Sequence, residues 1–231
     1  MKSSIKITKN GPYAVSGKIP LKKEIILTDD EGYSSKFGQG EKYPLKEEYH
    51  LCRCGHSKNK PFCDGTHVEI KFDGTETASM KKFAQQAKKI KGDGIILLDA
   101  EDLCAFSRYC HSKKGSVWDS TRNSDNSKAK KEAIKEACNC ISGRLVVIKN
   151  GKAIEPKLKK SISLIEDPDR DCSGPIWVKG GIQIESSDGK KHECRNRCTL
   201  CRCGYSSNKP FCDGTHVSAK FNDGSIKKKR N

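Results

Sequence analysis

Alternating apolar and polar residues near the N-terminus predict a small β-rich unit. Alternation of this kind marks half-buried strands, and it occurs in residues 13–17, 24–28 and 49–51. A fourth apolar run, residues 69–72, is expected to be the strand that closes the unit. Short stretches rich in Gly, Pro or Asp separate these runs and predict turns at residues 11–12, 19–20, 29–32 and 38–40.

The same order of features returns near the C-terminus. Residues 174–182 resemble residues 11–19, and both stretches begin with Gly-Pro. Thr199-Leu200 leads into a cysteine motif as His50-Leu51 does. Such a duplication predicts two copies that pack against each other about a pseudo-two-fold axis.

The segment between the copies has a different pattern. Acidic residues suited to the first turn of a helix predict a helix from Asp99 or Ala100 through Cys110. Apolar residues at helical spacing predict a second helix over residues 126–138. Residues 145–148 are expected to form a strand that turns at Asn150-Gly151, and the polar residues 116–128 a loop.

These patterns divide the chain into three expected parts, residues 1–80, 81–165 and 166–231. We expect an α+β fold that is mostly β, with the first and last parts related by pseudo-two-fold symmetry and a partly helical insert between them. Apolar residues make up 34% of the 231 residues and aromatic residues 6%. A chain with so few apolar residues can form only small hydrophobic cores, and we expect metal sites to help stabilise them.

A cysteine motif occurs twice with the same spacing. Two cysteines are separated by one residue, a third follows after eight more residues, and a histidine follows after three. The members are Cys52, Cys54, Cys63 and His67 in the first copy, and Cys201, Cys203, Cys212 and His216 in the second. Three thiolates and one imidazole are a complete ligand set for a metal centre.

The spacing leaves two kinds of centre open. The two cysteines that are separated by one residue are expected to bind one metal atom. Cys63 and His67, four positions apart on a helical turn, can bind a second atom or complete the first site. A single zinc ion would make the motif a structural knuckle, but zinc ligand pairs usually lie two to four residues apart. The tighter pair is more typical of a two-iron centre.

Composition also bears on the location of the protein. The N-terminal residues contain no apolar signal-peptide region, and the best apolar run, residues 95–98, is too short to span a membrane. We therefore expect a cytoplasmic protein without a membrane partner. In a reducing compartment, thirteen cysteines favour metal binding over disulfides.

The net charge of +16 raises the question of nucleic acid binding. However, the lysines are spread along the chain without interleaved aromatic residues, and only residues 227–230 form a clear basic run. An acidic protein partner is at least as compatible with this charge, and nucleic acid is the less favoured partner.

The full motif, C-x-C-x2-S-x3-P-x-C-D-G-T-H, resembles that of the CDGSH iron–sulfur domain family. Thr66 and Thr215 stand where the family usually has Ser, a position that holds no ligand. The resemblance covers both ends of the chain, and two motifs around an insert look like the layout of microbial tandem members. It implies that each motif holds a [2Fe–2S] cluster through its three Cys and one His, beneath a small β-rich cap.

The resemblance also implies how the clusters would behave. Ligation by three thiolates and one imidazole places the reduction potential between that of plant-type ferredoxins, at about −400 mV, and that of Rieske centres with two His ligands. Because the imidazole can protonate, both the potential and the retention of the cluster are expected to depend on pH. Single-motif members pair two protomers, and the duplication would build this pair within one chain.

The middle segment contains a second candidate site. Cys104, Cys110 and Cys140 resemble the cysteines of a mono-cluster ferredoxin, with Ser107 where a further Cys is usual. They would suit a [3Fe–4S] cluster, or a [4Fe–4S] cluster with a borrowed ligand such as His111. The pattern departs from such ferredoxins because no Pro follows Cys140 and the first two cysteines fall in a predicted helix. The alternative is that these are reduced core cysteines.

The remaining cysteines, Cys138, Cys172, Cys194 and Cys198, show no ligand spacing. Cys194 and Cys198 resemble a C-x3-C pair, but we expect them to be strand residues that lead into the second motif.

These observations favour a non-enzymatic iron–sulfur protein that acts in electron transfer, cluster transfer or redox sensing with an acidic redox or cluster-acceptor protein. The sequence shows no catalytic nucleophile with its base, no phosphate-binding loop and no nucleotide fingerprint. One alternative is a zinc-stabilised interaction module whose basic surface binds an acidic partner or nucleic acid. Another is the electron-transfer subunit of a separate enzyme.

Overall fold

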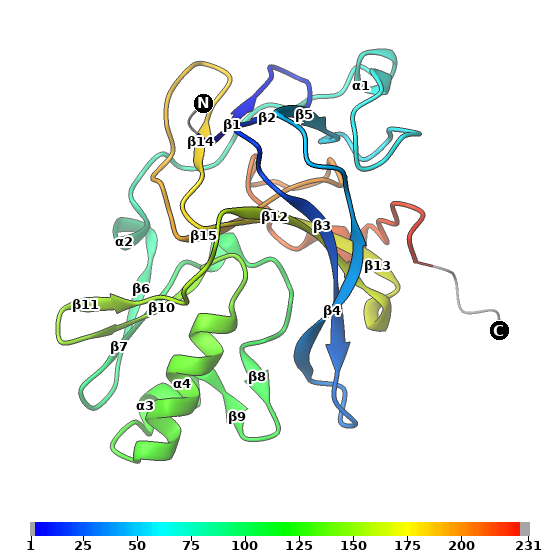
Figure 1. Ribbon diagram of the computed structural model, residues 1–231. Helices are drawn as coiled ribbons and strands as arrows, with labels where there is room; N and C mark the ends of the chain where they lie inside the picture. The colour runs from blue at the N-terminus through cyan, green and yellow to red at the C-terminus, as the bar shows by residue number, and fades with distance from the viewer. Residues whose placement is uncertain (1–2, 227–231) are drawn as a thin grey trace.

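A computed structural model describes residues 3–226 of the chain (Figure 1). The strands are β1 (Ser4–Ile7), β2 (Tyr13–Ser16), β3 (Leu21–Thr28), β4 (Ser34–Lys42), β5 (Glu48–Leu51), β6 (Lys88–Lys91), β7 (Ile96–Asp99), β8 (His111–Ser112), β9 (Gly115–Ser116), β10 (Leu145–Lys149), β11 (Lys152–Ile154), β12 (Ser161–Asp167), β13 (Cys172–Lys179), β14 (Gln183–Glu185) and β15 (Arg197–Leu200). The helices are α1 (Thr66–Glu69), α2 (Phe83–Gln86), α3 (Val117–Arg122), α4 (Ser127–Asn139) and α5 (Thr215–Ser218), with short 3-10 helices η1 (Glu101–Leu103) and η2 (Pro168–Arg170). The expected α+β fold with mostly β structure is confirmed.

Strands from both ends of the chain combine within two sheets. One sheet has the order β14-β1-β2-β5, and the other has the order β15-β13-β12-β3-β4. The N-terminal strands β1 and β3 pair in parallel with the C-terminal strands β14 and β12 (Figure 1). Parallel neighbours require a long connection between them in the chain. Here the connection includes the whole middle segment.

One apolar core lies between these two sheets and draws on both repeats. It includes Ile5, Val15 and Leu51 from the first repeat and Ile176 and Leu200 from the second, each no more than 1% exposed. The strand β12 contributes Ile162 and Leu164 to the same core, and its range, 161–167, spans the boundary expected at residues 165 and 166. The three-part division of the chain stays a prediction.

The middle segment forms its own layer, a sheet of order β11-β10-β7-β6 covered by α3 and α4 (Figure 1). The predicted helix at residues 126–138 is confirmed as α4. It begins at Asn126, whose side-chain oxygen accepts hydrogen bonds from the backbone N–H groups of Lys128 and Ala129. The predicted strand and turn are β10 and Asn150-Gly151, where both residues have positive φ as a tight hairpin turn requires.

The helix expected from residue 99 or 100 through Cys110 is wrong. Only η1 is helical there, and residues 104–110 are an extended loop. Phe106 and Arg108 have φ of 56° and 64°, which no right-handed helix accommodates. The Arg108 guanidinium binds Asp167 of β12, so the loop is held by a tertiary ion pair that local propensity does not reveal.

Three other local expectations are also wrong. The expected closing strand at 69–72 is instead the end of α1 and a turn. The expected loop at 116–128 contains α3, because the Ser116 hydroxyl caps the backbone N–H of Asp119 at 3.2 Å. Gly38 and Gly40 lie within β4 rather than in a turn.

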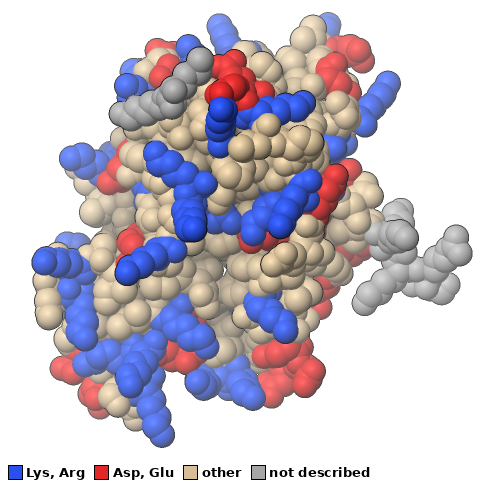
Figure 2. All heavy atoms as spheres, viewed as in Figure 1, with Lys and Arg blue, Asp and Glu red and all other residues tan. Residues whose placement is uncertain are grey.

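The surface matches the spread of charge along the sequence. Figure 2 shows Lys and Arg side chains distributed over the visible face, with Asp and Glu among them. The basic run at residues 227–230 lies outside the described residues. Over residues 3–226, no helix has both the length and the apolar character needed to cross a membrane.

Candidate metal centres

The first motif brings its four expected ligands together as two pairs. The Sγ atoms of Cys52 and Cys54 lie 3.8 Å apart. The Sγ atom of Cys63 lies 3.3 Å from Nδ1 of His67. Cys52 and Cys54 are buried, whereas Cys63 and His67 are partly exposed. The motif therefore presents two pairs of donors and not a set of four equivalent ones.

The second motif repeats this arrangement. Cys201 Sγ and Cys203 Sγ lie 3.6 Å apart, and Cys212 Sγ lies 3.4 Å from Nδ1 of His216. All four side chains are buried here. Two independent stretches of the chain thus form the same donor geometry in different surroundings.

A folded-back loop brings the two pairs of each motif together. In the first motif, the backbone N–H of Cys52 donates to the carbonyl of Pro61, and the N–H of Cys63 donates to the carbonyl of His50. These bonds place the end of the loop beside its beginning. The second motif makes the equivalent bonds from Cys201 to Pro210 and from Cys212 to Thr199.

A turn between the third Cys and the His brings this pair together. The α1 helix starts only at Thr66, so the expected helical turn over residues 63–67 is not formed. Instead, Asp64 Oδ1 accepts hydrogen bonds from the N–H and the hydroxyl of Thr66, at 3.1 and 2.7 Å. Gly65 has a φ of 93°, a conformation that favours glycine. The hydroxyl at this position is therefore structural, and Thr supplies it as Ser would.

The pair distances test whether a metal fits. Two ligands on one tetrahedral metal atom lie about 3.5–3.8 Å apart when the metal–sulfur and metal–nitrogen bonds are about 2.3 and 2.0 Å long. Each of the four observed pairs is near this separation. Among residues 3–226, however, no group of three or more His, Cys, Asp or Glu side chains is placed to hold one ion. The donors suit two metal atoms per motif better than a single zinc ion.

Nearby donors stabilise the thiolate of the first cysteine in each motif, whereas the shared hydrogen bond and burial raise the pKa of the second cysteine. The hydrogen bond with Cys54, together with backbone N–H groups, lowers the pKa of Cys52 to about 6. The equivalent bond with Cys203 lowers the pKa of Cys201 to about 6. Backbone N–H groups also point at the sulfur atoms of Cys54 and Cys212, each at 3.5 Å. Such hydrogen bonds favour bound thiolate and raise the reduction potential of an iron–sulfur centre.

The two motifs contact each other through one glycine in each motif. Gly55 lies against the backbone carbonyl of Cys203, and Gly204 lies against that of Cys54. Because each motif makes the same contact with the other, the contact is of the reciprocal kind that a two-fold axis produces. This contact was not anticipated from the sequence, although the repeated Gly at one motif position was a visible signal.

A buried arginine follows the first cysteine of each motif, with different partners. Arg53 bonds to the carbonyls of Thr8 and Gly74. Arg202 instead forms ion pairs with Glu166 and Asp223, at 2.7 and 2.6 Å. The second motif therefore has two buried acidic side chains nearby that have no equivalent among the partners of Arg53.

The middle cysteines are also brought together. Cys104, Cys110 and Cys140 line one small pocket together with Ser107. Burial raises the pKa of Cys110 to about 12, and the neighbouring Cys140 and Cys104 add to the shift. His111 does not line this pocket, although its Nδ1 lies 3.3 Å from Cys110 Sγ. The predicted helix over Cys104 and Cys110 was an objection to a cluster at this site. Because residues 104–110 form a loop, that objection no longer holds.

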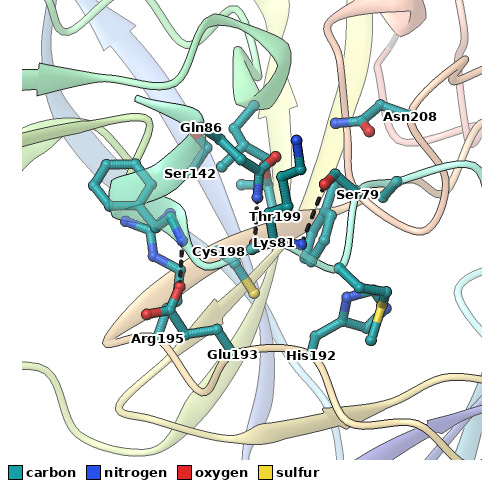
Figure 3. A pocket seen from close by; sticks show the side chains of 15 residues that line it. Ser79, Lys81, Gln86, Ser142, His192, Glu193, Arg195, Cys198, Thr199 and Asn208 are labelled. Atoms are coloured by element: carbon teal, nitrogen blue, oxygen red, sulfur yellow. Dashed lines mark hydrogen bonds between the residues drawn. The ribbon is translucent and has the colours of Figure 1, made fainter. Parts of the chain in front are cut away.

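The other cysteines form no comparable group. Cys198 lies in β15, as expected, and it lines a pocket together with Arg195 and Asn208 (Figure 3). Cys194 is exposed and lies outside any strand, so the strand expected there is wrong. Cys172 is buried in β13, and Cys138 lies in α4 with its sulfur 3.9 Å from the carbonyl of Ile154.

Comparison with known families gives three matches along the chain. The model described as "Iron-binding zinc finger CDGSH type" matches residues 10–68 and 173–217, which contain all eight expected ligands. The model described as "Divergent 4Fe-4S mono-cluster" matches residues 90–150, which contain the three middle cysteines. No curated protein matches the chain.

Proposed function

Because this chain belongs to the CDGSH iron–sulfur family, with one family region near each end, we propose that it binds two [2Fe–2S] clusters, each through three Cys and one His. The first cluster is bound by Cys52, Cys54, Cys63 and His67, and the second by Cys201, Cys203, Cys212 and His216. When bound, each cluster supplies one-electron redox chemistry.

The observation that carries the proposal is the pairing of the ligands. In both motifs, two cysteines are spaced to share one metal atom, and a Cys–His pair is spaced to share another. A two-iron centre needs two such pairs, whereas a zinc knuckle needs four donors around one ion. In the first motif, the charge of Lys60 also lowers the pKa of Cys52, which favours an electron-accepting centre.

We propose a third cluster at Cys104, Cys110 and Cys140. The match to a mono-cluster family over residues 90–150 and the shared pocket support it. Three thiolates suit a [3Fe–4S] cluster, and a [4Fe–4S] cluster would need a further ligand. Ser107 lines the same pocket and stands at the position of the missing cysteine.

With these centres, the protein acts as a carrier of electrons or clusters, or as a redox sensor, and not as an enzyme. Its net charge of +16 favours an acidic protein partner, since opposite charge speeds the encounter of two proteins.

Iron and acid-labile sulfide analysis of anaerobically purified protein tests the proposal. Two [2Fe–2S] clusters give about four irons and four sulfides per chain, and a third cluster raises the iron to about seven or eight. Cys110→Ser should lower the count to about four if the middle site is loaded. Colourless protein with stoichiometric zinc and no sulfide would overturn the proposal in favour of a zinc module.

A further inference from the structure

The two CDGSH motifs have nearly the same sequence but unequal exposure. In the second motif, Cys212 and His216 are each 3% exposed. In the first, Cys63 and His67 are partly exposed, and Val68 beside them is 69% exposed. Since the motif itself is the same, the difference must come from what packs on each copy.

The middle segment covers the second motif on the side of its Cys–His pair. A β-carbon on Gly214 would lie 3.2 Å from the carbonyl oxygen of Cys104 and 3.4 Å from the β-carbon of Phe106. At the equivalent Gly65, a β-carbon would have no atom within 4 Å. The loop after η1 therefore closes over the turn that precedes His216, and the turn that precedes His67 is open.

A hydrogen bond fixes this loop to the second motif. The side-chain amide of Asn208 donates to the carbonyl of Asp102 at 2.8 Å. The equivalent Asn59 makes no side-chain hydrogen bond to any residue between 3 and 226. At its far end the loop is anchored by Arg108, which pairs with Asp167. Both ends of residues 102–108 are thus tied down across the second motif.

The opposite sides of the two motifs are closed to solvent in the same way. The reciprocal contacts of Gly55 with Cys203 and of Gly204 with Cys54 bury the first two cysteines of both motifs. Within residues 3–226, the two motifs therefore differ in access at the Cys–His pair, which is partly exposed in the first motif and covered in the second.

We propose that residues 102–106 are a built-in cover that makes the two sites unequal, so that the first site exchanges its cluster with an acceptor and the second site retains its own. This inference deepens the proposed function and rests on it. In the exchange, the three thiolates and the imidazole of the first site are replaced as iron ligands by the ligands of the acceptor. The oxidation state does not change, and the freed thiolates take up the protons that the acceptor's ligands release when they bind iron.

Site-resolved loss of iron from the wild-type holoprotein tests the proposal. The protein is incubated with EDTA, the visible absorbance is followed, and newly freed cysteines are trapped with iodoacetamide and identified by mass spectrometry. We expect Cys63 to be labelled about tenfold faster than Cys212. Equal rates of labelling at the two motifs, measured on the same sample, would overturn the proposal.

Variants of Phe106 test whether the cover causes the difference in the rate of iron loss between the two sites. Phe106→Gly removes both the β-carbon and the ring, and glycine suits the φ of 56° at this position, so it should bring the loss from the second site close to that from the first. Phe106→Leu, which keeps the apolar bulk, should leave the loss slow. If Phe106→Gly leaves the ratio unchanged while circular dichroism shows a native fold, the cover is not the cause and the proposal fails. If the variant does not fold, the wild-type comparison still decides. Protein that carries neither iron nor sulfide would instead refute the proposed function itself.

Discussion

Gly204 approaches the carbonyl oxygen of Cys54 so closely that a β-carbon would lie 2.5 Å from it, and Gly55 meets Cys203 in the same way. Both glycines have positive φ, 86° for Gly204 and 81° for Gly55. The two cluster motifs therefore depend on each other for their backbone positions. This reciprocal contact makes the duplication a structural unit and not two independent modules.

Substitution of these glycines tests that dependence. Gly55→Ala should destabilise the fold by several kcal/mol, because the added β-carbon meets backbone that cannot move away and the φ is unfavourable. Iron content should fall at both motifs, although only one is changed. Gly189→Ala is the matched control, since Gly189 also has positive φ but no atom within 4 Å of the added carbon. A loss of iron from the first motif alone would contradict the mutual dependence.

The Thr hydroxyl of the motif should matter more than its methyl group. Thr66→Val removes the hydroxyl that donates to Asp64 at 2.7 Å, and we expect faster loss of the first cluster. Thr66→Ser keeps the donor and should behave as wild type. The half-time of the visible absorbance under EDTA measures both. If Val and Ser variants lose the cluster at the same rate, the turn does not depend on this bond.

The charges around Arg202 predict unequal potentials for the two clusters. Asp223 and Glu166 offset the positive charge of Arg202, whereas Arg53 forms no ion pair with any residue between 3 and 226. The cluster near Arg202 should therefore accept an electron less readily than the first. Asp223→Asn should raise the potential of one cluster towards that of the other in a redox titration followed by absorbance. Asp188→Asn, at an exposed turn, is the control and should change neither potential.

A buried acid on α4 predicts a pH dependence of stability that is separate from the clusters. Glu136 is 3% exposed, and neither carboxylate oxygen has a hydrogen-bond partner among residues 3–226, so burial raises its pKa to about 7. The folded state therefore holds a proton that the unfolded chain releases above its ordinary pKa of 4.5. Its contribution is full below that pH and is lost as the pH rises through about 7.

Urea unfolding at pH 6 and pH 8.5 measures this effect. Wild-type protein should lose about 1 kcal/mol of stability across this interval through Glu136, and Glu136→Gln should remove the loss. Glu132→Gln is the control: Glu132 is also buried but pairs with Lys114 and Lys135, and its pKa is lowered despite burial. That variant should be less stable than wild type at both pH values. An unchanged pH slope in Glu136→Gln would contradict the assignment.

The amino-acid sequence was enough to predict the features that local chemistry controls. The eight expected ligands are brought together in pairs because their spacing, the Asp-Gly-Thr turn and the loop hydrogen bonds act within about eighteen residues. The helix at α4 and the hairpin at Asn150-Gly151 were likewise predictable, since capping and turn conformations depend on neighbouring residues.

Tertiary structure alone decided how the repeats are joined and which of them is open. The pairing of β1 with β14 and of β3 with β12 links residues more than 130 positions apart, and no local pattern encodes such a register. The loop at residues 104–110 is not helical because its conformation is held by Asp167 and by the second motif. Two nearly identical sequences therefore differ in exposure, because burial depends on what packs against a segment and not on the segment itself.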